Sequence, residues 1–238
     1  MKKTAAIVDY RISAACESAL TERGFFVIKL PPFCKIGSPL SSHTDMLAAH
    51  IGDALIMPGD YLNENPALEA ILKSELQGIR LVKSTASPAS PYPADAIMNV
   101  LIGNGRIYAR AASACPDILS QAEQLGYELT NVNQGYPSCT VLLLDKTAVT
   151  ADEGMRRALE ATGIRVYTVR NGGISLPPYE YGFIGGACGV FERTVYFLGD
   201  LNSHPDAAVI REACVTAGYD TVSLSSEGLV DLGGIIFI

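Results

Sequence analysis

Five glycines along the chain each stand between a segment of helical character and a segment rich in β-branched and aromatic residues. They are Gly24, Gly78, Gly126, Gly163 and Gly218, and the segments that follow them are FFVIKL, IRLVKS, YELTNV, IRVYTV and YDTVSL. A glycine just past the last helical residue adopts the left-handed conformation at little steric cost and therefore marks a helix end. The intervals of 54, 48, 37 and 55 residues predict one structural unit that is used five times.

Four of the predicted units begin near His43, Tyr92, Tyr136 and Tyr181. In each, an apolar run precedes a tight polar turn (GD, GNG, DKT or FERT), a second apolar run follows, and then come a helical stretch and a third strand. This order is a ββαβ module. The N-terminal segment holds only strand, helix and strand, and the closing LGGIIFI is similar enough to IGGACGVF to supply its first strand.

We therefore predict an α/β fold: a five-unit α/β propeller of ββαβ modules, with the ring closed by the C-terminal strand and residues 1–238 forming a single domain. The alternative is an open βαβ sheet. The absence of an early GxGxxG sequence and the short polar turns, which are typical of hairpins, favour the propeller.

Composition limits the class of protein. Of the 238 residues, 48% are hydrophobic and 18% charged, which is enough to bury a large core. The net charge of −7, without a basic cluster, argues against a nucleic-acid partner. The longest apolar runs are far shorter than the roughly 20 residues of a membrane span, and MKKTAAIVDY lacks the apolar core of a secretory signal. We expect a cytoplasmic protein without a membrane partner; its oligomeric state is left open.

Metal and cofactor sites are not expected. The six cysteines form no CxxC pair, and none has a histidine at the spacing of a zinc site. The three histidines are scattered, and the cysteines are interpreted as free thiols in a reducing compartment.

The segment PADAIMNVLIGNGRIYA resembles the part of the deiminases in which Gly-Gly-Asp precedes a strand, a GNG turn and a second strand. On this basis the chain is identified as a divergent member of the pentein superfamily, which contains arginine and agmatine deiminases, dimethylarginine dimethylaminohydrolase and glycine amidinotransferase. The resemblance implies that Asp95 takes the place of an aspartate that binds the substrate guanidinium. Alternatively, Asp95 caps a turn after Pro91 and Pro93.

Two departures from the family concern its reacting groups. Catalytic members carry a nucleophilic cysteine on the last strand in a pattern like GGGxHC, whereas this chain has Gly233 to Ile238 there, without cysteine. The family histidine lies in a GHxD pattern, and the comparable GFIGGACG has none. Without thiolate and acid/base partner, amidine hydrolysis by the family mechanism is not expected.

The heads of the first strands are expected to converge on the central channel and to supply a rebuilt site. Its proposed catalytic residues are His43 and Cys188, and its proposed substrate-binding residues are Asp45, Asp95, Asn99, Cys139, Gly185 and Gly186. Two residues apart on one strand, His43 and Asp45 would point to the same face, where the carboxylate raises the basicity of the imidazole. Alternatively, HTD is a solvated turn, and Cys139 and Cys188 are buried unreactive thiols.

Glycines and aromatic residues gather before the last unit. Gly182, Gly185, Gly186 and Gly189 predict a tight bend or a close approach of the backbone to another segment or a ligand. The stretch from Arg170 to Gly186 is expected to form a lid or ligand wall, or else only a longer connection between units.

Two functions follow. The first is an amidinotransferase-like or deiminase-like pentein that binds a guanidino, amidino or related small polar ligand in the channel; if active, it would act on C–N bonds. The alternative is a non-catalytic pentein that binds a protein or a metabolite, as translation initiation factor six uses this fold to bind a ribosomal subunit.

Overall fold

The computed structural model describes residues 4–238 and contains five small sheets of the same design. In each sheet the first strand is antiparallel to the middle strand, and the third strand is parallel to it. In the order first, middle and third strand, the sheets are β17 (Ile236–Phe237), β1 (Ala5–Asp9) and β2 (Phe26–Leu30); β3 (Ala49–Ile51), β4 (Ala54–Pro58) and β5 (Arg80–Ser84); β6 (Leu101–Gly103), β7 (Arg106–Ala109) and β8 (Glu128–Asn131); β9 (Val141–Leu144), β10 (Thr147–Thr150) and β11 (Arg165–Thr168); and β13 (Cys188–Phe191), β14 (Thr194–Phe197) and β15 (Asp220–Ser223). The short strands β12 (Ile174–Ser175) and β16 (Leu229–Val230) pair separately.

A helix connects the middle strand of each sheet to its third strand, as a parallel pair requires. The connecting helices are α1 (Ala14–Glu22), α3 (Gly59–Glu64) with α4 (Pro66–Glu75), α5 (Pro116–Gln124), α7 (Glu153–Ala161) and α8 (Ala207–Ala217). The five predicted stop signals are confirmed. Gly24, Gly78, Gly126, Gly163 and Gly218 all have positive φ, between 72° and 90°.

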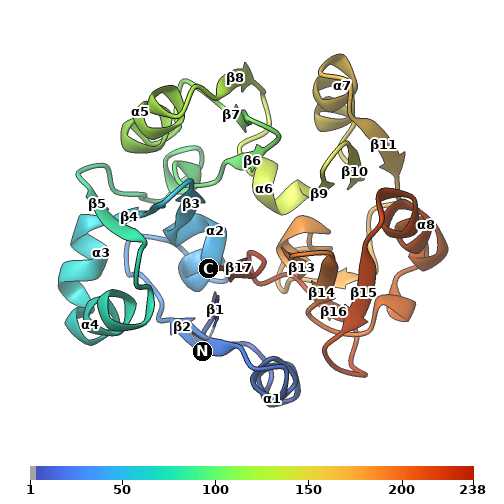
Figure 1. Cartoon of the computed structure of the whole chain (residues 1–238), viewed down its shortest axis with the longest axis horizontal. Coiled ribbons are helices and arrows are strands. Elements are labelled where there is room, and N and C mark those ends of the chain that lie inside the picture. The colour runs from blue at the N-terminus through green and yellow to red at the C-terminus, as the bar shows by residue number, and fades with distance from the viewer. Residues whose placement is uncertain (1–3) are drawn as a thin grey trace.

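The last strand pairs with the first, as the sequence predicts. Ala6 lies opposite Phe237 and Ile7 opposite Ile236, and Ala5 and Ile238 exchange backbone hydrogen bonds of 2.7 and 2.9 Å. Figure 1 shows the C-terminus beside β1, with the other sheets placed around this pair. Strand β1 therefore has a neighbour on both edges.

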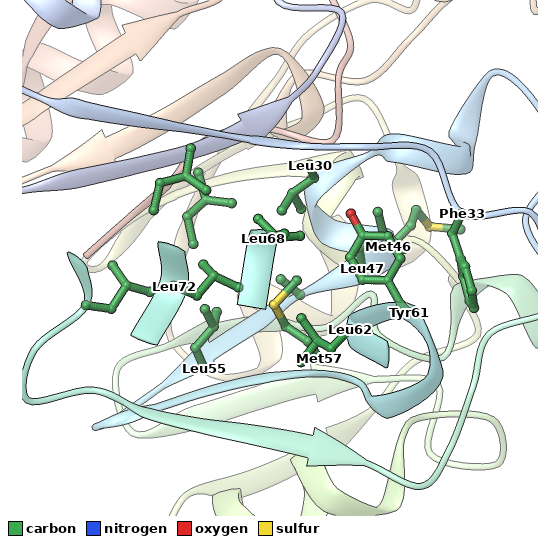
Figure 2. Packing of buried hydrophobic residues seen from close by; sticks show 14 of the residues in the cluster. Leu30, Phe33, Met46, Leu47, Leu55, Met57, Tyr61, Leu62, Leu68 and Leu72 are labelled. Atoms are coloured by element: carbon green, nitrogen blue, oxygen red, sulfur yellow. The ribbon is translucent and has the colours of Figure 1, made fainter. Parts of the chain in front are cut away.

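Hydrophobic clusters lie between successive sheets. Between the first two sheets, Leu30 packs with Met46, Leu55, Tyr61 and Leu72 (Figure 2). Similar clusters lie between the second and third, third and fourth, and fourth and fifth sheets. A further cluster joins the fifth sheet to the first, so every sheet packs against two neighbours.

Short helical turns precede the first strands of four sheets. They are α2 (Thr44–Leu47), η2 (Ala94–Ala96), α6 (Pro137–Thr140) and η3 (Gly185–Ala187); two further turns are η1 (Leu40–Ser42) and η4 (Leu201–Ser203). The prediction that His43 and Asp45 share one strand is wrong. The chain forms a helical turn here instead of an extended strand: His43 is the residue before α2, and Asp45 lies within α2. Both side chains are buried.

No helix among residues 4–238 has both the length and the apolar character needed to span a bilayer.

Candidate functional site

A fully buried histidine lies between two carboxylates at the centre of the molecule. The Nδ1 atom of His43 is 3.4 Å from Asp9 Oδ2, and its Nε2 atom is 3.4 Å from Asp231 Oδ1. Arg11 binds Asp9 with its Nε and Nη2 atoms and also lies 3.0 Å from His43 Nδ1. The hydroxyl of Ser42 donates to Asp9 as well. Segments from both ends of the chain thus meet at one imidazole.

This arrangement determines the charge of His43. Burial alone would lower its pKa, but the carboxylates of Asp231 and Asp9 raise the pKa to about 9. Hydrogen bonds from His43 and Arg11 lower the pKa of Asp9 to about 2 against the opposing effect of burial. Asp9 and Asp231 thus face two basic side chains, of which Arg11 is a permanent cation and His43 has a raised pKa.

Asp231 is held in place by backbone amides. Its Oδ2 atom accepts from the amide of Phe183 at 2.8 Å, and its Oδ1 atom accepts from the amide of Gly233 at 3.0 Å. The space that its side chain fills exists because Gly182 and Gly186 lack a side chain: a Cβ at either position would overlap Asp231. The close approach predicted for this glycine-rich stretch is confirmed.

Asp45 and Cys139 form a second buried pair. The Sγ atom of Cys139 lies 2.6 Å from Asp45 Oδ2, whereas Asp45 Oδ1 has no hydrogen-bond partner. Burial raises the pKa of Asp45 to about 7 although His43 opposes the shift. Burial, together with the neighbouring Asp45, raises the pKa of Cys139 well above its usual value. At neutral pH the sulfur is consequently a thiol.

A cavity of about 370 Å³ opens above these groups. Three buried polar side chains, His43, Cys139 and Asp231, form part of its lining. The aromatic side chains around it are Tyr136, Tyr179, Tyr181 and Phe183. Leu40, Met46, Leu176 and Glu180 complete this lining, and we call the space the aromatic cavity.

The stretch from Arg170 to Gly186 contributes much of the aromatic cavity wall. Leu176, Tyr179 and Glu180 come from it, and Tyr179 keeps 54% of its surface exposed. The same stretch also borders a second cavity of about 320 Å³ beside His204. The stretch is anchored at one end by the ion pair of Arg170 with Asp206 and at the other by Asp231.

Asp95 and Asn99 lie behind the aromatic cavity and are not among its lining residues. Asp95 Oδ2 accepts from the hydroxyl of Tyr136 at 3.2 Å, Oδ1 has no partner, and burial raises the pKa of Asp95. Asn99 accepts from the amide of Ser138 and places its own amide 3.8 Å from Cys139 Sγ. Asp95 is thus connected to the cavity through Tyr136, and Asn99 through Cys139.

The thiol of Cys188 faces away from the aromatic cavity. It donates to the carbonyl of Ile184 at 3.1 Å, packs in the cluster between the fourth and fifth sheets, and has a pKa raised by burial. The cysteine that shares the cavity with His43 is Cys139. Gly185 allows η3 to approach α6, since a Cβ there would overlap the Ser138 carbonyl.

Several residues of this site carry no signal in the sequence. Asp9, Arg11 and Asp231 lie at strand ends or in loops, and Tyr136, Tyr179 and Tyr181 mark only unit boundaries or a loop. The clustering of tyrosines around two prolines before the last unit is the one feature that pointed to the cavity wall. Within residues 4–238, no group of three or more His, Cys, Asp or Glu side chains is arranged to hold a metal ion.

Several solved structures of enzymes have a similar fold. A dimethylarginine dimethylaminohydrolase is 12% identical, with a TM-score of 0.57 and coverage of 95% of this chain and 93% of the other. Inosamine-phosphate amidinotransferase from Streptomyces griseus is 14% identical, with a TM-score of 0.56 and coverages of 94% and 78%. Agmatine deiminase from C. jejuni is 10% identical, with a TM-score of 0.54 and coverage of 97% of this chain and 80% of the other. At these identities the likeness shows the fold, which is that of the pentein superfamily.

A search of the curated proteins finds no match. One family model matches residues 7–236, almost the whole chain. The chain therefore belongs to the family described as "Family of unknown function (DUF6873)" and has a pentein-superfamily fold.

Proposed function

We propose that this protein binds a small cationic ligand with a guanidino, amidino or related head group in the aromatic cavity, and that it lacks the thiolate chemistry of catalytic penteins. The observation that carries the proposal is the aromatic cavity itself: four aromatic side chains surround buried polar groups at the centre of the fold. Aromatic faces attract cations, and an aromatic-walled cavity with few polar groups is the usual form of a small-molecule site.

The charges near the cavity support a cationic ligand. His43 and Arg11 contact Asp9 and Asp231, whereas the rim residue Glu180 has no cation as an ion-pair partner within residues 4–238. A guanidinium or amidinium group would supply that charge and could stack on tyrosine. The enzymes with similar folds carry names that refer to dimethylarginine, agmatine and amidino transfer, which is consistent with this class.

The state of the thiols supports binding without turnover. Cys139 and Cys188, the two thiols that the sequence suggested, are buried and have raised pKa values, so each is a protonated, weak nucleophile. No cysteine lies on β17, where the superfamily resemblance places the nucleophile. A second candidate function, hydrolysis or transfer at the amidine carbon through Cys139, is favoured only by the shared cavity with His43.

We infer that the five sheets form one closed α/β propeller and a single domain, because each sheet packs against two neighbours and β17 completes the sheet of β1. We further propose a cytoplasmic location and no nucleic-acid partner; the acidic net charge without a basic cluster supports the second of these.

The test is titration calorimetry with benzamidine, whose flat amidinium and apolar ring match the cavity, against benzamide as the neutral isostere. We expect benzamidine to bind and benzamide to bind at least about threefold more weakly. Tyr179→Ala removes one aromatic side chain of the lining and should weaken the binding of benzamidine by about threefold to tenfold. Tyr10→Ala is the matched control, because Tyr10 is also about half exposed but is not part of this lining. Equal binding of benzamidine and benzamide, or no binding of either, would rule the proposal out.

A further inference from the structure

The Cys139–Asp45 pair separates two cavities. Cys139 faces the aromatic cavity, and Asp45 borders another cavity of about 290 Å³, which Ser138 and Cys188 also line. Cys139 Sγ contacts Asp45 Oδ2. A ligand that binds against Cys139 in the aromatic cavity would therefore have the Asp45 carboxyl on the other side of this thiol. Asp45 thus lies within electrostatic reach of the aromatic cavity without being open to it.

The side chains around Asp45 pair only part of its carboxyl group. Its Oδ1 atom is buried without a hydrogen-bond partner, while Oδ2 receives the weak Cys139 thiol. A buried carboxylate with an unpartnered oxygen is unstable relative to the neutral acid. The unpartnered atom therefore identifies a carboxyl group that keeps its proton below about pH 7 unless a cation lies nearby.

We propose that Asp45 exchanges its proton for the charge of the ligand: when a guanidinium or amidinium head binds against Cys139, Asp45 ionises and releases one proton to solvent. This inference rests on the cation-binding function proposed above and assigns its specificity to one residue. No covalent bond forms or breaks apart from the O–H bond of Asp45, whose proton passes to the buffer.

The other groups around Asp45 fit this exchange. His43 is the nearest cation on the same turn, but it is shared between Asp231 and Asp9. From α6, Cys139 offers a thiol. The Asn99 amide lies 3.8 Å from Cys139 Sγ and also lowers the pKa of Asp45, but it carries no charge. From the loop after β16, Gly233 packs against Asp45 and Asp231 adds a negative charge. None of these groups supplies an unshared positive charge, so a bound cation would be the first.

The exchange makes ligand affinity depend on pH in a defined direction. With the pKa of Asp45 near 7, binding below that pH must displace a proton, and affinity for a cation should fall by up to tenfold for each pH unit. Above about pH 7.5 Asp45 is already ionised, and affinity should level off. His43, with its pKa near 9, keeps its charge throughout the range from pH 5.5 to 7.5.

The experiment is calorimetry of benzamidine binding at pH 6.5 in phosphate, MOPS and imidazole buffers, whose different ionisation enthalpies report the protons released. We expect release of about half a proton or more per ligand for the native chain. Asp45→Asn, which imitates the neutral acid, should abolish the release and remove the pH dependence between 5.5 and 7.5. Benzamide should release no proton from either protein.

Asp95→Asn is the control, because Asp95 is the other buried carboxyl with an unpartnered oxygen and a raised pKa near the cavity. It should leave the release unchanged. If benzamidine binds but releases no proton, or if the release persists in Asp45→Asn, the exchange is refuted while the binding function stands. If the release disappears in Asp95→Asn instead, the wrong carboxyl has been assigned. Failure of benzamidine to bind at all would remove both proposals together.

Discussion

His43 Nε2 lies 3.4 Å from Asp231 Oδ1, and both side chains are completely buried. The two residues are 188 positions apart in the 238-residue sequence, one before α2 and the other after β16. Their contact brings the second and the last unit together at the centre. It also raises the pKa of the buried imidazole, because the Asp231 carboxylate is fixed beside it by two backbone amides.

Replacing Asp231 by asparagine should destabilise the protein by about 3 kcal/mol, because the change removes one of the two carboxylates that face the buried His43. The amide of asparagine also cannot accept from both Phe183 and Gly233. Urea unfolding at pH 7 measures the effect. Asp145→Asn is the control, since its ion pair with Arg193 is exposed and its loss should leave the unfolding midpoint unchanged. Equal midpoints for the two variants would contradict a charged His43.

The accessibility of the thiols gives a second prediction. Of the six cysteines only Cys34 is exposed. In the native protein a maleimide should label Cys34 at least about tenfold faster than any other cysteine, and all six should react after denaturation. Mass spectrometry of the labelled peptides identifies the sites. Labelling of Cys139 or Cys188 as fast as Cys34 would show an activated thiol and would favour the enzymatic alternative.

The repeated units were predictable because their signals are local. A helix, a glycine with positive φ and a β-rich run follow one another within about twenty residues, and Gly218, for example, has the left-handed conformation that its position demands. The pairing of the last strand with β1 was predictable only because LGGIIFI resembles the start of another unit.

The site was harder to predict because its residues meet through long-range packing. His43 and Cys139 were identified from their places at the unit heads, yet nothing in the sequence connects them to Asp9 or Asp231. The short turns α2 and α6 were expected to be strand, and a side chain that leaves a turn points in a different direction from one on a strand. Hence Cys139, rather than Cys188, shares a cavity with His43.

The glycine-rich stretch before β13 allows a third prediction. Gly186→Ala should cost about 1–3 kcal/mol of unfolding free energy, because the added methyl group would overlap the Asp231 carboxylate. Gly228→Ala is a matched control: the nearest atom to its Cβ is Ser203 Oγ at 4.0 Å, and the effect should stay within about 0.5 kcal/mol. Urea unfolding of both variants under the same conditions measures the two changes. If Gly186→Ala lowers the unfolding free energy no more than Gly228→Ala does, Asp231 can move aside.

The buried acid and the buried base together predict how stability depends on pH. The pKa of Asp45 rises from 3.8 to about 7 on folding, and that of His43 from 6.5 to about 9, so the folded state binds more protons than the unfolded state. Stability must then fall as pH rises, through Asp45 between about 4 and 7 and through His43 between 6.5 and 9. Each group contributes a slope of up to about 1.4 kcal/mol per pH unit within its range.

Urea unfolding across pH 4.5 to 9.5 separates the two contributions, since Asp45→Asn removes the lower part of the slope and leaves the upper part. Asp9 acts in the opposite sense, because its pKa falls to about 2, and its stabilising contribution is lost only as pH drops below about 4. A stability profile that stays level from pH 4.5 to 9 would mean that neither Asp45 nor His43 has a raised pKa in the folded protein, and the electrostatic assignment at the centre of the site would be wrong.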